Sequence, residues 1–140
     1  MHPIYGSLQA IAFRLLPGSD VRADLERWAQ REAISAAVVI GAVGSLSQAR
    51  LRFADQESGK TLPGKHEVLT LSGTLSTTGV HLHMMVANST GHCTGGHVLV
   101  GCQVYTTLEI AIALMPDIQF DRPIDPTTGF NELRISSKNL

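Results

Sequence analysis

The chain has 140 residues, of which 44% are hydrophobic and only 16% charged, and its formal net charge is −1. This length fits a single domain over residues 1–140, and the near-neutral charge excludes a broadly basic surface for nucleic-acid phosphates. The apolar composition indicates that copies of the chain cover part of its surface in a homo-oligomer.

The sequence contains no segment typical of export or membrane insertion. Its first residues lack a basic segment followed by an apolar run, and no apolar stretch is long enough to span a bilayer. The two cysteines, Cys93 and Cys102, form no CxxC pair and imply no disulfide framework. We therefore expect a cytoplasmic protein with reduced thiols and no membrane partner, in which Cys102 is a small buried residue.

A strand and an amphipathic helix are predicted at the start of the chain. Leu8 to Leu16 is β-like and ends at the turn signal Pro17-Gly18. Ser19 or Asp20 can then cap a helix. The apolar residues of this helix recur at helical spacing, and they are Val21, Leu25, Trp28 and Ala29. We expect this stripe to face the core, with Trp28 as an anchor.

Two strands and a polar loop are expected next. Residues 36–44 have the continuous apolar character of a strand buried on both faces, and Ala49 to Phe53 forms the following strand. On that strand Arg50 and Arg52 share one face, which is either solvated or able to meet an anion. The polar loop from Asp55 to Lys65 is long enough to act as a mobile lid.

A hairpin and another long strand are predicted in the second half. From residue 67 the side chains alternate, with Glu67, Leu69, Leu71 and Leu75 on one face and Val68, Thr70, Ser72 and Thr74 on the other. The turn at 77–79 leads into an antiparallel partner at 81–87. Residues 93–97 read as an irregular stretch, 104–114 as a strand and 130–135 as a short apolar segment. This order predicts an α+β fold with a mostly antiparallel sheet.

Three histidines are the residues best suited to chemistry. If 81–87 is a strand, His81 and His83 point to the same face, because side chains alternate with a period of two. The Gly95-Gly96 pair allows a tight turn or a close approach to another segment, so that His97 could close on the pair. Three neutral imidazoles can hold zinc and leave one position open for water or a small ligand.

Other polar residues are weaker candidates. Glu109 is a carboxylate in an otherwise uncharged strand and needs a partner, and either Glu109 or Glu67 could orient a metal ligand or act as a general base. His66 and His92 are expected at the surface, and Cys93 ranks below the three histidines as a ligand. No nucleophile elbow, phosphate-binding glycine loop or dinucleotide fingerprint names a substrate, so the catalytic residues are unknown.

Several of these motifs occur together, in the same order, in one known family. The matching segments are Glu67 to Gly73, His81-Leu82-His83, Gly95-Gly96-His97, Gly101-Cys102 and Thr106 to Glu109, with Val43 to Leu46 upstream and Thr128 to Phe130 downstream. They resemble the plant-and-prokaryote-conserved (PPC) domain over nearly the whole chain. The H-x-H and G-G-H segments are the most specific parts of the resemblance.

The resemblance implies a fold, an assembly and a metal. It implies an antiparallel sheet flanked by helices, a homotrimer, and zinc held by His81, His83 and His97. In plant members the domain follows an AT-hook, an Arg-Gly-Arg-Pro element that enters the DNA minor groove. That element does not occur in this sequence, which weakens the DNA-binding function often attached to such chains.

Three interpretations of the histidines remain open at this point. The first is a metal or small-ligand site, for which zinc-assisted hydrolysis or hydration of a carbonyl is the reaction class to test. The second is a regulatory module that binds DNA or a protein. The third is a subunit interface that the histidines stabilise without a ligand. The spacing leaves open whether a metal site lies within one subunit or between subunits.

Overall fold

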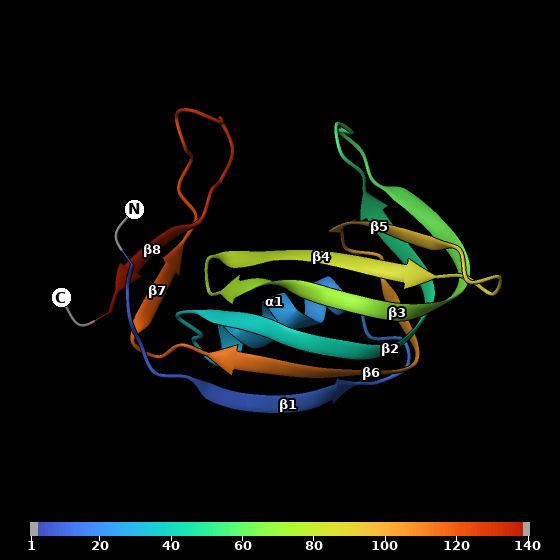
Figure 1. Cartoon of the computed structure of the whole chain (residues 1–140), viewed down its shortest axis with the longest axis horizontal. Helices are drawn as coiled ribbons and strands as arrows, with labels where there is room; N and C mark the ends of the chain where they lie inside the picture. Colours follow the sequence, from blue (N-terminus) through green and yellow to red (C-terminus); the bar gives the residue numbers. More distant parts are fainter. Residues whose placement is uncertain (1–2, 139–140) are drawn as a thin grey trace.

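The computed structural model describes residues 3–138, which form eight strands and one helix (Figure 1). The elements are β1 (Gln9–Leu15), α1 (Val21–Arg31), β2 (Ala37–Arg52), β3 (Lys60–Ser76), β4 (Gly79–Ala87), β5 (Cys93–Val98), β6 (Gln103–Leu114), β7 (Ile118–Asp121) and β8 (Arg134–Ser137). Six strands form one antiparallel sheet in the order β1-β6-β2-β3-β4-β5, and β7 pairs with β8 separately. The mostly antiparallel sheet predicted from the sequence is confirmed.

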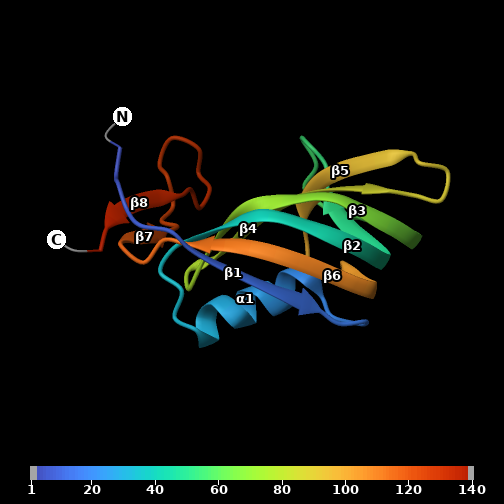
Figure 2. The same ribbon diagram turned by 60° about the horizontal axis from the view of Figure 1, so that its bottom comes forward.

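Helix α1 covers one face of the large sheet (Figure 2). Asp20 caps its N-terminus by accepting a hydrogen bond from the Ala23 amide at 3.0 Å, as the sequence predicted. Leu25 is fully buried, and Trp28 packs its ring against Phe13 at a centroid distance of 5.4 Å. The resemblance implied several flanking helices, whereas the described residues contain this one, and it is too short to cross a membrane.

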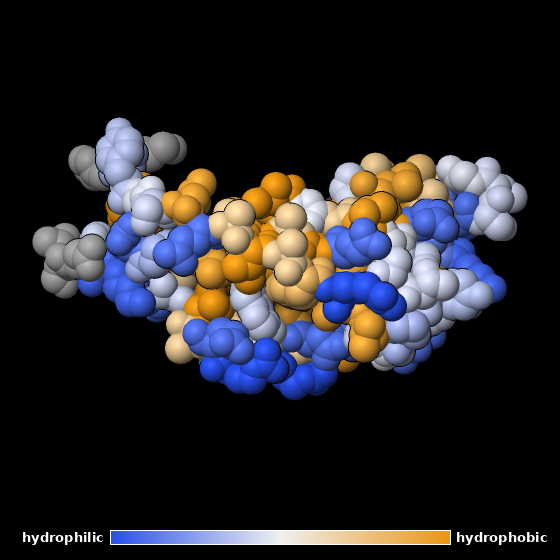
Figure 3. Space-filling model, turned by 90° about the horizontal axis from the view of Figure 1, so that it is seen from below, coloured by the Kyte–Doolittle hydropathy of each residue, from blue (hydrophilic) through white to orange (hydrophobic). Residues whose placement is uncertain are grey.

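The opposite face of the sheet carries exposed apolar side chains. Ile40 and Val43 on β2 are 62% and 61% exposed, so the prediction that 36–44 is buried on both faces is wrong for the chain by itself. Seen from the β1 edge, hydrophilic residues gather on the side of α1 and hydrophobic ones over the middle of the sheet (Figure 3). Around Ile40 and Val43, none of the elements that the structure describes covers the second face of β2.

Strands β2 and β3 are longer than the sequence predicted. The two strands expected at 36–44 and 49–53 are one continuous strand, which bends through shifts of register at three places between Val39 and Gln48. Strand β3 already begins at Lys60. Only the first half of the loop expected at 55–65 is therefore a loop, and its second half belongs to β3. Pro63 and Gly64 suggested a loop, but they lie beside a register shift where a strand tolerates them.

A bulge in β3 overturns the simple alternation predicted from Glu67. Val68 pairs with Val86 but Thr70 pairs with Met85, so one extra residue is inserted at Leu69. Val68 is therefore buried together with Leu71, while Leu69 is 46% exposed. On β4 the alternation holds, and Leu82, Met84 and Val86 face the core as predicted.

The stretch 93–97 is not irregular, as the sequence suggested, but belongs to strand β5. It pairs with β4 along 83–87 and also with the end of β2, where Arg52 lies opposite His97. A Cβ at Gly96 would lie only 2.8 Å from the carbonyl oxygen of Arg52. The glycine thus permits the close approach of β5 to β2 that carries His97 to its position.

Gly73 of β3 permits a second close approach, in which β3 packs against the backbone of β4 at His81. Its φ is +147°, and a Cβ there would collide with the carbonyl oxygen of His81 on β4.

We predict that Gly73→Ala lowers the free energy of unfolding by more than about 2 kcal/mol in urea denaturation, because it combines backbone strain with a collision. Gly91→Ala, at φ +77° in the open β4–β5 turn, carries the backbone cost alone and should lose only about 1 kcal/mol. Equal losses would contradict the close packing of β3 on His81.

Candidate metal centre

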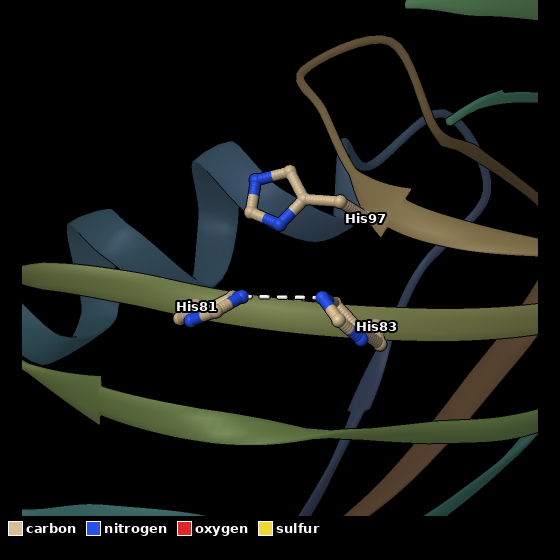
Figure 4. Close-up of side chains that lie close together, drawn as sticks. All are labelled: His81, His83 and His97. Atoms are coloured by element: carbon tan, nitrogen blue, oxygen red, sulfur yellow. Dashed lines mark hydrogen bonds between the residues drawn. The ribbon is translucent and has the colours of Figure 1, made fainter. Parts of the chain in front are cut away.

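The register of β4 and β5 brings the three predicted histidines together. His83 lies directly opposite His97 in the β4–β5 ladder, and His81 is two residues from His83 on the same face. The ring centroids are 4.9 to 5.6 Å apart, and the three rings converge on one point (Figure 4). All three side chains come from one chain, so the set is complete within a subunit.

The spacing of the ring nitrogens suits a shared metal ion. One nitrogen from each ring lies within 4.8 Å of the others, and the Nε2 atoms of His81 and His83 are 3.1 Å apart. Two nitrogens bound to one tetrahedral zinc ion at about 2.05 Å lie roughly 3.3 Å from each other. The three histidines could therefore hold a metal ion after small adjustments of their side chains.

The two ring nitrogens of His97 have different surroundings. Nε2 lies 3.3 Å from Nη1 of Arg22, and because a guanidinium only donates, Nε2 is the acceptor. Nδ1 is buried and has no hydrogen-bond partner. A buried ring nitrogen without a partner costs free energy, so an atom that binds Nδ1 would stabilise the protein.

Burial and neighbouring charges keep two of the imidazoles neutral. Burial lowers the pKa of His97 from 6.5 to about 4, and the nearby His81 and Arg22 contribute to the same shift. The pKa of His81 is also lowered, first by burial and then by His83 and Arg122. Neutral imidazole is the form that binds a metal, so both side chains are ready ligands at neutral pH.

A cleft of about 1120 Å³ opens beside the histidines and is lined by His81 and His97. The loop after β2 and the loop between β7 and β8, which rise at the two ends of the sheet in Figure 1, both contribute to its walls. Its charged lining residues are Arg22, Glu26, Arg52, Asp55, Glu57, Arg122 and Glu132. A small molecule in this cleft would touch the histidine cluster from the side.

A family model described as the Plants and Prokaryotes Conserved (PCC) domain matches residues 3–116. The chain belongs to this family. It is the family that the sequence motifs resembled under the name PPC domain, and the match includes all three histidines. The recognition made from the H-x-H and G-G-H segments is confirmed.

Two solved structures show the same PPC fold. A hypothetical protein from Salmonella enterica is 41% identical, with a TM-score of 0.94 over 98% of this chain and 99% of that one. A metal-containing protein from Archaeoglobus fulgidus is 24% identical, with a TM-score of 0.83 over 96% and 99% of the two chains. Some further structures with this fold are named as candidate DNA-binding proteins.

The PPC domain also occurs within a longer protein. The bifunctional protein GlmU from two Synechococcus strains is 48% identical over 130 residues, which are 93% of this chain. The chain spans about a fifth of the length of these curated relatives, 21% in each case. The same fold is therefore found as one segment of a larger chain.

The two predicted carboxylates lie away from the histidines of the PPC domain. Glu109 is on β6, and two strands lie between β6 and β4, a separation of about 14 Å. It is exposed, so its charge needs no buried partner, and it lies opposite Arg14 in the β1–β6 ladder. Glu67 pairs with Ala87, which lies four residues along β4 from His83. This spacing places Glu67 about 13 Å from His83 along the strand.

The remaining candidates divide between core and surface. His66 is buried rather than at the surface, because the β2–β3 register turns it inward, where its Nδ1 lies 2.8 Å from the carbonyl oxygen of Gly64. His92 is exposed as predicted. Cys93 is exposed at the far end of β5 from His97, and Cys102 is buried as expected, which raises the pKa of its thiol to about 11.

Sequence reasoning missed two arginines that border the cluster. Arg22 on α1 donates to the carbonyl oxygens of Val98 at 2.9 Å and Val80 at 3.2 Å. Arg122 follows β7 and donates to Oγ1 of Thr74 at 2.6 Å. Neither belongs to a motif, since each comes from a segment distant from the histidines in sequence.

The low pKa of His97 predicts how the metal-free protein responds to acid. The unfolded chain takes up a proton near pH 6.5, whereas folded His97 does so only near pH 4. The free energy of unfolding should therefore fall as the pH is lowered from 6.5 to 4 and then level off with respect to this group. In His97→Gln this fall should be smaller in urea denaturation with a chelator present. His92→Gln, in an exposed turn, should keep the wild-type profile, and identical profiles for all three proteins would contradict the assignment.

Proposed function

We propose that this PPC domain binds one divalent metal ion, zinc, through His81, His83 and His97, and presents its open position to a small ligand in the cleft. The observation that carries the proposal is the buried Nδ1 of His97, which has no partner and belongs to a cluster of converging imidazoles. The metal content of the Archaeoglobus fulgidus protein with the same fold supports it.

The chemistry of the donor set favours zinc over harder cations. Three imidazoles without a carboxylate suit zinc, while magnesium and calcium prefer oxygen ligands. Three protein ligands leave a fourth position open, which is the arrangement of reactive rather than structural zinc sites. When bound, the metal supplies Lewis acidity at that position, suited to polarising a carbonyl or acidifying water.

Metal binding at Nδ1 of His97 has a consequence for Arg22. The ring proton of a neutral imidazole must then lie on Nε2, where it faces the Nη1 donor of Arg22. Two donors at 3.3 Å do not bond, so the hydrogen bond from Arg22 to this nitrogen would be lost. Arg22 would keep its bonds to the carbonyl oxygens of Val98 and Val80 and its ion pair with Glu26 at 3.1 Å.

We also propose that three copies assemble through the open face of the sheet. Exposed Ile40 and Val43 lie beside a groove of about 750 Å³ that Phe13 and Ile110 also line. Exposed apolar side chains on this scale are typical of surfaces that a partner covers. Each histidine cluster would remain complete within its own subunit, in the cytoplasmic setting expected for the chain.

DNA binding is the alternative function, and some proteins with this fold are named for it. The charge distribution gives it less support than a small ligand. Asp55, Glu57 and Glu132 are exposed along the cleft that holds the arginines, so a long polyanion would meet these carboxylates first. A module that binds a protein partner remains a further alternative.

The metal proposal predicts about one zinc ion per chain in protein purified without a histidine tag. Elemental analysis should find that His81→Ala/His83→Ala loses at least nine-tenths of it, because one imidazole cannot hold zinc alone. His66→Ala/His92→Ala removes two imidazoles outside the cluster and should retain the metal. Equal zinc in wild type and in the His81/His83 variant would refute the site.

The assembly proposal predicts a particle three times the 15.0 kDa of one chain in sedimentation equilibrium. Ile40→Asp places a charge on the open face and should shift the mass toward that of one chain. Val100→Asp, at a 51% exposed position in the β5–β6 turn, is the matched control and should leave the trimer intact. A wild-type monomer, or a trimer that survives Ile40→Asp, would count against this interface.

A further inference from the structure

Two arginines in the cleft have no carboxylate within ion-pair distance in the part of the chain that the structure describes. Arg52 donates only to the carbonyl oxygen of Gln56 at 3.3 Å, and Arg122 only to Oγ1 of Thr74 at 2.6 Å. Among the described residues neither forms an ion pair, although both side chains are partly buried. A guanidinium has five N–H groups, so most of the donors on each remain available.

Both arginines line the cleft that His81 and His97 also line. Arg52 lies opposite His97 in the β2–β5 ladder, and its charge is among the causes that lower the pKa of His97. The charge of Arg122 likewise lowers the pKa of His81. Burial lowers the pKa of Arg122 itself, while the charge of Glu132 acts in the opposite direction. The net shift is downward, so an anion in direct contact with the guanidinium would offset a remaining cost of burial.

The carboxylates of the same cleft form no ion pair with Arg52 or Arg122. Glu26 is already paired with Arg22. Glu132 accepts a hydrogen bond from Thr128, and its charge raises the pKa of Arg122 from beyond ion-pair distance. Asp55 and Glu57 are exposed on the loop after β2. The arginines are thus the less exposed charges and the free carboxylates the more exposed ones, which gives the cleft a basic interior and an acidic rim.

We propose that the cleft binds a small molecule through an oxyanion group, a carboxylate or a phosphate, held by Arg52 and Arg122 beside the histidine cluster. Arginine donates two parallel hydrogen bonds to such groups, which fixes their orientation as well as their charge. Because His81 and His97 line the same cleft, the bound molecule would lie beside the histidine cluster. Phe130, which lines the same cleft and is 73% exposed, offers an apolar surface to the rest of the molecule.

This inference deepens the metal proposal, yet its arginine part stands without a metal. The acidic rim selects against long polyanions, because their flanking phosphates would meet Asp55 and Glu57. A compact molecule with one or two oxyanion groups can pass the rim and reach the arginines. The ligand class is therefore a small carboxylic acid or phosphate ester rather than a nucleic acid.

The test uses inorganic phosphate and oxalate as probes in calorimetric titrations of zinc-loaded and chelator-treated protein. We expect Arg52→Gln and Arg122→Gln each to weaken binding of at least one probe about tenfold or more, since each removes charge-assisted hydrogen bonds. Arg31→Gln, which removes an exposed charge from α1 outside the cleft, should bind as wild type does. Zinc content, measured on each variant, should stay at the wild-type level.

The outcomes separate the two proposals. Undiminished probe binding in both arginine variants, or no binding by the zinc-loaded wild type, overturns the oxyanion site even if zinc is present. Absence of zinc from the wild type with arginine-dependent binding intact overturns the metal proposal alone. A short DNA duplex that binds more tightly than either probe, and loses affinity in both variants, replaces the small molecule by nucleic acid.

Discussion

The antiparallel pairing of β4 with β5 is the constraint on which the candidate site depends. Its register sets His83 opposite His97, and the two-residue period of a strand adds His81 on the same face. Shifting β5 by one residue would turn His97 to the other face of the strand. The pairing of β5 with the end of β2, permitted by Gly96, holds this register from the other side.

Electrostatics explain why such a cluster is stable before a ligand arrives. Burial, together with neighbouring histidine and arginine charges, lowers the pKa of His81 and lowers that of His97 to about 4, so both rings are neutral near pH 7. The cluster keeps one buried ring nitrogen without a partner, and it lies beside arginines that form no ion pair, Arg52 and Arg122. A cation between the rings and an oxyanion on the arginines together would satisfy both features.

The sequence predicted the parts of this fold that depend on local pattern. Alternation on β4 placed His81 and His83 on one face, and the Asp20 cap placed α1. Prediction from the sequence failed where a pattern is interrupted. The bulge at Leu69 changed which residues of β3 face the core, and the glycines before His97 made strand β5 look like an irregular stretch. Arg22 and Arg122 escaped notice because tertiary structure alone brings them to the histidines.

The proposal that His81, His83 and His97 bind zinc is tested most directly by identifying the atom between the three rings. Crystals of untagged protein should be measured with X-rays on both sides of the zinc absorption edge. We predict an anomalous peak, present only above the edge, about 2.0–2.1 Å from one nitrogen each of His81, His83 and His97. A well-ordered cluster with no such peak, or with the imidazoles bonded only to one another and to solvent, would contradict it.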